Sequence, residues 1–418
     1  MNTLYRLSGV ALLALVLTPA ALANETAALT IEALQQRALE GNGEVLAAQA
    51  QVRASEAAVT GAAAYPNPEL ELQGGQDRAR VAGVTAGANR ALFVTQRIEN
   101  PALRSARIGA AEAGVVVNRS GLERVRADVA AAMRVRAFEL LLRQEEALAA
   151  KRDLTLLEDV QSRVKVRVDV GEAARYELIK ADSEVLAARS RAEAASLNAQ
   201  RARLALVQLA GGRLQPDFTV AASLLDPVRL SDLAGLRQQA LEANPDVAGL
   251  QAELARAQLR TSQERATVLP SLQVKLGQQQ DAEIRSNIAG VNLAIPLFDR
   301  RRGPIAEAVA ETERVRAKLA FRRFEIGQQI ESAWQAKQIA QRKVEMFEGG
   351  VVKEAEAALR VAQAAYRFGE RGLLDVLDAQ RVLRGVRAEL LQARFELHAA
   401  AAEIDRLRAH YPQEQELK

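Results

Sequence analysis

The sequence has 418 residues, of which 49% are hydrophobic and only 4% aromatic, and 56 lysines and arginines stand against 52 aspartates and glutamates. Long stretches lack glycine and proline, which is typical of long helices packed through alanine and argues against several compact domains. Basic residues are dispersed among acids, so no nucleic-acid surface is expected, and the absence of cysteine excludes disulfides, thiol chemistry and a lipidated N-terminal cysteine.

The first residues are typical of a secretory signal. Arg6 supplies a positive charge, residues 10–17 an apolar core, and Ala21-Leu22-Ala23 a cleavage site. Residues 1–23 are therefore predicted to be a signal peptide, and the mature chain to begin near Asn24. No later apolar run approaches the roughly 20 residues that a membrane-spanning helix needs. Any contact with a membrane interior is expected to come from strands.

The mature chain begins with a helix and a pair of strands. Thr30 to Ala64 have a helical pattern that is interrupted at Gly41-Asn42-Gly43. Polar and apolar residues then alternate from Glu69 to Gln73, which indicates a strand, and Gly74-Gly75 with Asp77 are predicted to form its turn. Val84 to Ile98 is the predicted returning strand.

A much longer helix follows the strands. Its pattern begins at Pro101 and continues without proline to about Val168, which corresponds to roughly 100 Å of helix. A turn at Gly171 then sends the chain back along a shorter helix, Glu172 to Leu209. Because the return helix cannot cover the whole outward helix, Thr30 to Ala64 are expected to stack end-on with it.

The whole pattern then recurs as an internal tandem duplication. Leu34 to Val45 (LQQRALEGNGEV) align without gaps with Leu236 to Val247 (LRQQALEANPDV). The chain therefore divides into a first repeat at residues 24–227, a second repeat at residues 228–411 and a tail at residues 412–418. The elements predicted for the second repeat are strands at Ser271 to Leu276 and Ile284 to Ile295, a long helix from Pro304 to about Arg367 with a candidate break at Gly349-Gly350, and a return helix from Leu373 to about Ala409.

Two hairpin tips occupy equivalent places in the repeats. Tyr366 to Ala379 (YRFGERGLLDVLDA) and Val168 to Ala181 (VDVGEAARYELIKA) align at a constant offset that places Gly171 under Gly369. A glycine at this position ends one helix and allows the next to begin. The chain is therefore predicted to form two helical hairpins.

Only the second tip has two acidic residues on one helix face. Asp375 and Asp378 are three residues apart, so they lie about one turn from each other on the same side of the helix. The first tip has Glu177 and Lys180 at these places. The aspartates form a local anionic spot, or alternatively they only offset the positive end of the helix dipole.

The number of strands predicts an oligomer. Each repeat contributes two strands of about ten residues, the length of a tilted strand that crosses a membrane. Four strands cannot close into a barrel, and an open sheet in lipid would leave costly unpaired edges. Three chains would provide twelve strands, enough for a closed barrel that continues into a tube of long helices.

The chain resembles the TolC family of outer-membrane efflux proteins over essentially its whole mature length. The resemblance rests on the signal sequence, the duplication, the strand pairs after Pro68 and Pro270, the IPLFDRRRG stretch (Ile295 to Gly303) and above all the second tip. PNPEL (Pro66 to Leu70) and QRIENPALRSARI (Gln96 to Ile108) further resemble the subgroup that serves heavy-metal resistance exporters of the cobalt-zinc-cadmium and cobalt-nickel type.

This resemblance implies a mainly α fold with a small β part. Three chains would form a homotrimer whose long hairpins build a tunnel across the periplasm of a Gram-negative bacterium and whose strands share one twelve-stranded barrel in the outer membrane. The implied partners are a periplasmic adaptor and a proton-driven inner-membrane pump of the RND type. The implied cargo is a heavy-metal cation such as cobalt, nickel, zinc or cadmium, and a duct for drugs and other organic compounds is the alternative within the family.

The resemblance also assigns roles at the second tip. Tyr366 and Arg371 match family positions that hold the closed aperture, so they are expected to form hydrogen bonds or ion pairs across helices. Asp375 and Asp378 match acidic positions of the channel aperture, where they would face the lumen.

Other functional classes find little support in the residues present. No nucleophile and base constellation, Walker loop or dinucleotide fingerprint is recognisable, so an enzyme is not expected. The histidines, His398 and His410, are expected to be plain surface residues, and no cofactor or metal-storage site is expected from them or from the three dispersed methionines. A periplasmic adaptor, the competing non-enzyme class, would have one hairpin between β-rich halves, whereas two hairpins are predicted here.

Overall fold

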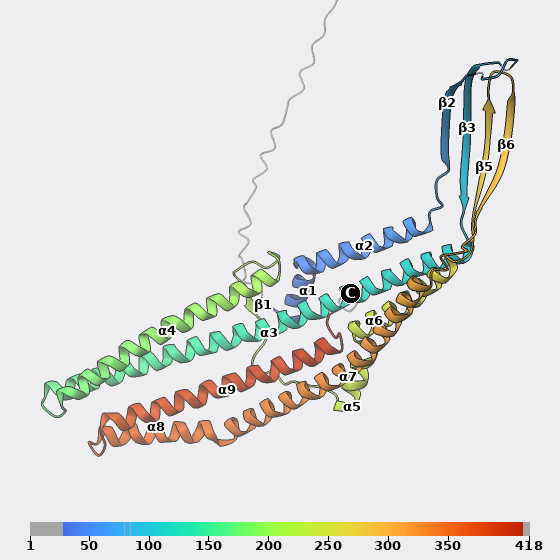
Figure 1. Cartoon of the computed structure of the whole chain (residues 1–418). Coiled ribbons are helices and arrows are strands. Elements are labelled where there is room, and N and C mark those ends of the chain that lie inside the picture. Colours follow the sequence, from blue (N-terminus) through green and yellow to red (C-terminus); the bar gives the residue numbers. More distant parts are fainter. Residues whose placement is uncertain (1–27, 79, 84, 413–418) are drawn as a thin grey trace, which may run out of the picture.

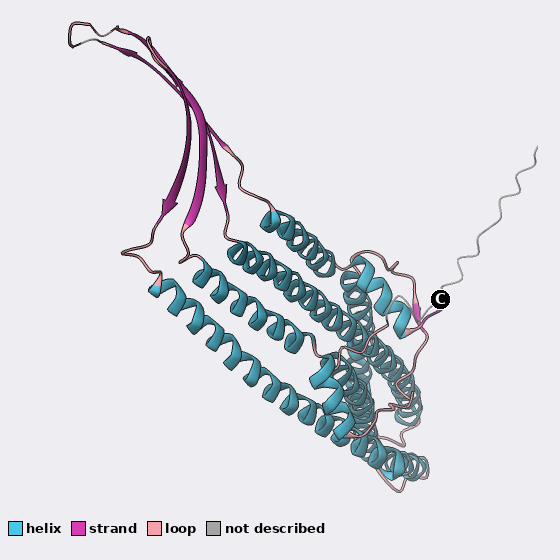
Figure 2. Ribbon diagram, turned by 90° about the vertical axis from the view of Figure 1, so that its right-hand side faces the viewer, coloured by secondary structure: helices cyan, strands magenta, loops and turns pink. Residues whose placement is uncertain are grey.

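A long helical body with a small sheet at one end makes up the protein (Figure 1). The computed structural model describes residues 28–412 except residues 79 and 84, so the predicted signal peptide lies outside the described residues. The sheet projects from the end opposite to the two hairpin tips and curves away from the helices (Figures 1 and 2). Among the described helices, none combines the length and the apolar character that a membrane crossing requires.

The two repeats contain the same main elements in the same order, which confirms the predicted duplication. The first repeat consists of α1 (Ile31–Gly41), α2 (Gly43–Ala63), β2 (Glu69–Asp77), β3 (Gly87–Ile98), α3 (Pro101–Asp169) and α4 (Arg175–Leu209). The second consists of α5 (Leu233–Ala243), α6 (Pro245–Ala266), β5 (Ser271–Gln280), β6 (Arg285–Ala294), α7 (Arg302–Met346), a π-helical turn (Phe347–Val351), α8 (Val352–Arg367) and α9 (Leu373–Leu407). A short parallel pair, β1 (Ala28–Leu29) with β4 (Thr219–Val220), was not predicted and ties the first described residues to the segment that follows α4 at the end of the first repeat.

The four long strands form one antiparallel sheet in the order β2-β3-β5-β6, so β3 and β5 join the repeats. The turn predicted at Gly74-Gly75 is wrong, because β2 continues through both glycines to Asp77. A Cβ atom at Gly75 would lie 2.7 Å from Asn89 Oδ1 on β3. The glycine thus marks a close approach of two strands, which its sequence neighbours alone do not reveal.

One face of the sheet is apolar and the other is polar. By the strand register, Leu70 lies opposite Val94, and Val94 lies opposite Leu276. All three side chains are exposed. On the other face, the Glu71 carboxylate lies 2.8 Å from Lys275 Nζ. Apolar and polar side chains therefore alternate along the strands, as expected for a sheet whose two faces lie in different environments.

An asparagine joins helices end to end in each repeat. Asn42 Oδ1 accepts the N–H of Glu44 at the start of α2 at 2.9 Å, and its Nδ2 donates to the carbonyl of Leu209 at the end of α4 at 3.0 Å. Asn244 has the equivalent place before α6, where its Nδ2 donates to the carbonyl of Leu407 at the end of α9 at 2.8 Å. Each side chain thus caps the start of one helix and the end of another. The predicted end-on stacking is confirmed.

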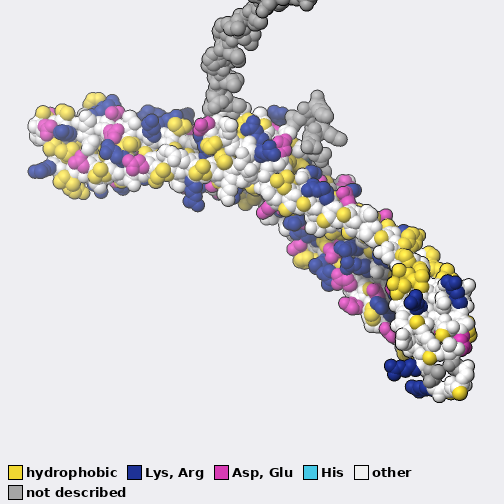
Figure 3. Space-filling view, turned by 90° about the horizontal axis from the view of Figure 1, so that it is seen from above, with side chains coloured by type: hydrophobic (Ala, Val, Ile, Leu, Met, Phe, Trp, Pro, Cys, Tyr) yellow, Lys and Arg dark blue, Asp and Glu magenta, His cyan; other side chains and the backbone are white. Residues whose placement is uncertain are grey.

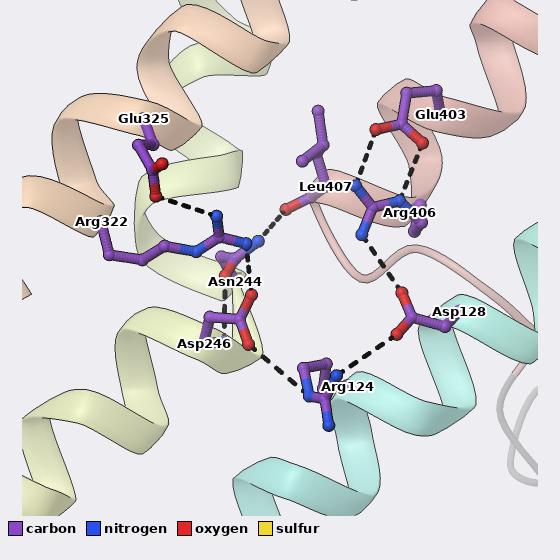
Figure 4. Close-up of polar contacts among 9 residues, drawn as sticks. All are labelled: Arg124, Asp128, Asn244, Asp246, Arg322, Glu325, Glu403, Arg406 and Leu407. Carbon is purple, nitrogen blue, oxygen red and sulfur yellow. Dashed lines mark hydrogen bonds and ion pairs between the residues drawn. The ribbon is translucent and has the colours of Figure 1, made fainter.

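Ion pairs connect the two repeats near these joints (Figure 4). Asp246 at the start of α6 lies 3.7 Å from Arg124 of α3 and 2.5 Å from Arg322 of α7. One turn further along α3, Asp128 lies 3.1 Å from Arg406 of α9. Because these side chains are partly exposed, each pair adds only modestly to stability. Together they fix the position of α3 against α6 and α9, and that of α6 against α7.

The break predicted at Gly349-Gly350 is a single π-helical turn, through which α7 continues into α8. A π turn accommodates one extra residue in a helix. The second repeat needs this residue, because buried Val129 lies 42 residues before Gly171 whereas its counterpart, buried Ile326, lies 43 residues before Gly369. The π turn therefore keeps the cores and the tips of both repeats aligned.

Candidate functional site at the hairpin tips

Both tips turn on a glycine with a left-handed backbone. The φ angle is +79° at Gly171 and +74° at Gly369, a conformation that costs a residue with a Cβ atom about 1–2 kcal/mol. In the first tip the N–H of Glu172 donates to the Arg167 carbonyl at 2.8 Å, and the second tip has the equivalent bond at 2.9 Å. This is the Schellman arrangement that ends a helix. The two glycines lie where the sequence predicts the hairpins to turn.

Tyr366 of α8 connects the second hairpin to the first. Its hydroxyl donates to Glu177 Oε2 of α4 at 3.2 Å, and the Arg167 guanidinium of α3 lies 4.9 Å from the centroid of its ring. Tyr366 is 7% exposed. Burial, reinforced by the negative charge of Glu177, raises the pKa of the tyrosine hydroxyl above its usual value. The hydroxyl therefore keeps its proton at neutral pH and can donate it to the carboxylate.

Arg371 contacts its own hairpin. Its guanidinium lies 3.4 Å from Asp375 Oδ1, and its side chain is 64% exposed. No hydrogen bond or ion pair from the Arg371 side chain to another hairpin is present among the described residues of this one chain, so its bond across helices stays a prediction. The residue lies in the exposed turn between α8 and α9, and its partner Asp375 belongs to the first turn of α9.

Asp375 and Asp378 share the exposed face of α9, as their spacing predicts. The intervening Val376 and Leu377 are 2% exposed, whereas the side chains of Asp375 and Asp378 are 44% and 71% exposed. Asp378 Oδ1 lies 3.4 Å from Arg381. Within the described residues, no group of three or more His, Cys, Asp or Glu side chains is placed to hold a metal ion. The two carboxylates thus form an accessible anionic spot that arginines partly neutralise.

A further layer of contacts joins the hairpins one turn from the aspartates, and it was not predicted. Gln380 of α9 donates to Asp153 of α3 at 2.6 Å, and Arg381 forms an ion pair with Glu184 of α4. These residues carry no local signal, because each occupies an ordinary helical position. The alignment of the two tips could have indicated Glu177, which occupies the place of Asp375.

His398 is buried, so the prediction of a surface residue is wrong. The residue is 2% exposed, and its ring stacks on Phe138 of α3 with 3.8 Å between centroids. Its two ring nitrogens are buried without a hydrogen-bond partner in the described part of the chain. Burial lowers the pKa of the imidazole to about 4, so the ring is neutral near pH 7. A run of alanines follows His398, so the sequence has no periodic pattern there that would indicate which side of α9 is buried. His410 is exposed, as predicted.

Known proteins share this architecture. The family model described as outer membrane efflux protein matches residues 34–212 and 236–410, one stretch in each repeat. The cobalt-zinc-cadmium resistance protein CzcC of Cupriavidus metallidurans is 30% identical over 381 residues, which cover 91% of this chain and 90% of that protein. The pyoverdine export outer membrane protein OpmQ of Pseudomonas putida is 27% identical over 64% of this chain and 58% of its own. A crystal structure of CusC has the same fold, with a TM-score of 0.79 at 18% identity over 90% of this chain and 91% of that chain.

Proposed function

Because the chain belongs to the outer membrane efflux protein family, we propose that it is the exit duct of a tripartite, proton-driven system that exports heavy-metal cations such as cobalt, nickel, zinc or cadmium. The coarse activity, an efflux channel of the outer membrane, follows from the family. The proposal that the cargo is a heavy-metal cation is supported by one observation. The metal-resistance relative matches 91% of this chain, whereas the pyoverdine exporter matches 64%.

Three copies would complete the channel. The sheet has two free edges, β2 and β6, and an exposed apolar face that includes Leu70, Val94 and Leu276. Unpaired edge groups are too costly in lipid, so these edges must meet the edges of other copies. Three sheets would form a twelve-stranded barrel with the apolar face toward lipid and the face of Glu71 and Lys275 toward the lumen.

Asp375 and Asp378 would form a ring of carboxylates at the periplasmic opening. In a trimer the two accessible carboxylates of each chain would be repeated three times around one axis. Rings of acidic side chains of this kind are common in pores that admit cations. Tyr366, bonded to Glu177, would hold the second hairpin against the first and keep the opening narrow. Arg371, which pairs with Asp375 within one chain, would reach a neighbouring copy in the closed state. The ring attracts hydrated divalent cations as passing cargo and does not retain them.

The partners of the duct would be a periplasmic adaptor and an inner-membrane pump of the RND type. A duct for drugs or other organic compounds is the second candidate, because a pyoverdine exporter is also similar to the chain. A periplasmic adaptor finds no support, since both repeats match the channel family.

Deletion of the gene tests the proposed cargo. The deletion strain should stop growing at lower concentrations of zinc, cobalt, nickel or cadmium than its parent and should retain more cell-associated metal. A plasmid copy of the wild-type gene should restore both properties. Organic dyes serve as the control cargo, to which both strains should be equally tolerant. Sensitivity to dyes with unchanged metal tolerance would contradict a metal cargo and favour the organic one.

A further inference from the structure

We propose that a row of arginines on the lipid side of the sheet binds the phosphate groups of a phosphorylated glycolipid in the outer leaflet of the outer membrane. The row consists of Arg90 and Arg285, and three copies of the chain would repeat it around the barrel. This inference rests on the proposed channel, because the sheet meets lipid only as part of a closed barrel. It adds a lipid partner that the passage of cargo does not require.

The two arginines lie in one row across the sheet. Arg90 of β3 pairs with Gln280 of β5, and Gln280 pairs in turn with Arg285 of β6. Neighbouring strands are about 4.8 Å apart, so roughly 10 Å separates the backbones of the two arginines. Both arginines are exposed. Their guanidinium groups can therefore bind one phosphate group together or two phosphate groups of the same lipid.

The row belongs to the apolar face of the sheet. Side chains alternate along a strand, so Arg90 is on the same side as Val94, and Arg285 is on the same side as Val291. Val94 and Val291 are 43% and 69% exposed, as expected for residues that contact lipid in a closed barrel. The arginines therefore lie on the lipid side of the barrel and not in its lumen.

The height of the row matches the level of the lipid headgroups. Ile295, directly after β6, lies at the base of the sheet and is 62% exposed. The distance from Arg285 to Ile295 is roughly 33 Å along the strand, or about 25 Å across the membrane at a tilt of about 40°. The apolar band of outer-membrane barrels is about 25 Å tall. Because the helical body adjoins the base of the sheet (Figure 1), the arginines lie at the outer surface of the membrane.

No carboxylate shares the apolar face of the four described strands with the arginines. The acidic residues of these strands are Glu69, Glu71 and Asp77 of β2, and their odd positions place all three on the opposite face. Figure 3 looks onto the free end of the sheet and shows Lys and Arg side chains around it. The lipid side therefore has a positive charge that no acid on the same face compensates.

The acids near the free end of the sheet are bonded to other groups. Asp77 accepts a hydrogen bond from the Asn89 side chain at 2.7 Å. In the loop after β5, Asp281 accepts the N–H of Glu283 at 2.8 Å, and the Glu283 carboxylate accepts the N–H of Thr85 at 2.7 Å. These carboxylates hold the ends of the strands together, which leaves the arginines available to another anion.

A neighbouring amide orients Arg285. Its Nη2 donates to Gln278 Oε1 at 2.7 Å, and Gln278 Nε2 donates to Asn287 Oδ1 at 2.9 Å. This bond leaves the other N–H groups of the guanidinium free. Arg90 forms no ion pair within the described part of the chain. The planar fork of arginine donors matches the oxygens of a phosphate group, and such charge-assisted bonds are stronger than neutral ones.

A phosphorylated lipid fits this surface better than a soluble anion does. The lipid would place its phosphate groups at the arginines and its acyl chains along the apolar face, which includes Leu92 and Val94. A free phosphate ion would gain the ionic contacts alone, and salt weakens such contacts at an exposed site. A cationic cargo would be repelled. The surface is therefore a lipid site and not a second cargo site.

Lipid binding to the purified full-length trimer tests the inference. The trimer is immobilised in a nonionic detergent and titrated with lipopolysaccharide, and separately with the same lipopolysaccharide after its phosphates have been removed. EDTA is present, so that no metal ion bridges the phosphates. The wild type should bind the phosphorylated form at least about tenfold more tightly than the dephosphorylated form, and Arg90→Gln/Arg285→Gln should lose this preference.

Two control variants separate position from charge. Arg97→Gln removes an exposed arginine from the opposite face of β3 and should bind both lipids as the wild type does. Arg90→Lys/Arg285→Lys keeps the charge without the planar fork and should keep part of the preference.

A trimeric wild type that binds both lipids equally would overturn the inference and leave the proposed channel intact. The same conclusion would follow if the glutamine variant kept the full preference. If that variant does not assemble, the comparison of the two lipids on the wild type decides. A wild-type protein that is monomeric when extracted would contradict the channel itself, and the lipid site with it.

Discussion

Acidification should weaken the packing of α9 on α3 through His398. Burial of this ring against Phe138 lowers its pKa from the usual 6.5 to about 4. In the unfolded chain the ring binds a proton near pH 6.5, whereas in the folded protein it resists protonation until about pH 4. The stability gained by burying the neutral His398 ring is therefore fully present above pH 6.5 and is lost as the pH falls toward 4. At 1.36 kcal/mol per pKa unit, the loss amounts to about 3 kcal/mol per chain.

His398→Phe removes the titrating group and keeps an aromatic ring against Phe138. The free energies of unfolding of the variant and the wild type should differ by only about 1 kcal/mol near pH 7.5. Below pH 6.5 the difference should grow in favour of the variant by about 1.4 kcal/mol per pH unit. Urea unfolding of detergent-solubilised protein, followed by circular dichroism, measures this difference. His410→Gln is the matched control, because His410 is exposed and its replacement should cause no such trend.

Comparison with the variant cancels the titration of carboxylates, which is common to both proteins. A difference that stays constant from pH 7.5 to pH 4.5 would refute the reasoning, because it would mean that the folded protein protonates His398 as readily as the unfolded chain does.

Three further predictions follow from the joints and the tips. Asn244→Ala should lower the free energy of unfolding by about 1–3 kcal/mol in urea titrations, since the side chain caps one helix and bonds the end of another; an unchanged midpoint would show that the joint is dispensable. Gly369→Ala should cost about 1–2 kcal/mol because of its positive φ, whereas the control Gly385→Ala, inside α9 with open space around it, should stabilise the protein by about 0.5–1 kcal/mol. Tyr366→Phe/Arg371→Ala should raise the single-channel conductance in planar bilayers, and equal conductance would show that these residues do not hold the opening.

The long helices could be predicted because their signals are local. The first long helix was expected from Pro101 to about Val168 and extends from Pro101 to Asp169. The errors concern residues whose environment is set by distant parts of the chain. The double glycine of β2 looks like a turn until Asn89 is placed beside it, and His398 looks like a surface residue until Phe138 is placed against it.

At the candidate site, too, some features follow from local sequence signals and others depend on distant parts of the chain. The positions of the tips follow from their glycines and from the alignment of the repeats. The partners of Tyr366 cannot be predicted in this way, because Glu177 is 189 residues away in the sequence and no periodic pattern relates the two residues. The roles of Asp375 and Asp378 in a pore stay predictions, since a pore forms only between copies of the chain.

The central claim is that three copies form an outer-membrane duct with an acidic opening. The reversal potential of single channels in planar bilayers under a salt gradient tests it most directly. The wild type should prefer cations and be blocked by multivalent cations added at the side of the tips, and Asp375→Ala/Asp378→Ala should lose most of both properties. Equal selectivity and equal block in the two proteins would contradict the claim that these aspartates line the duct.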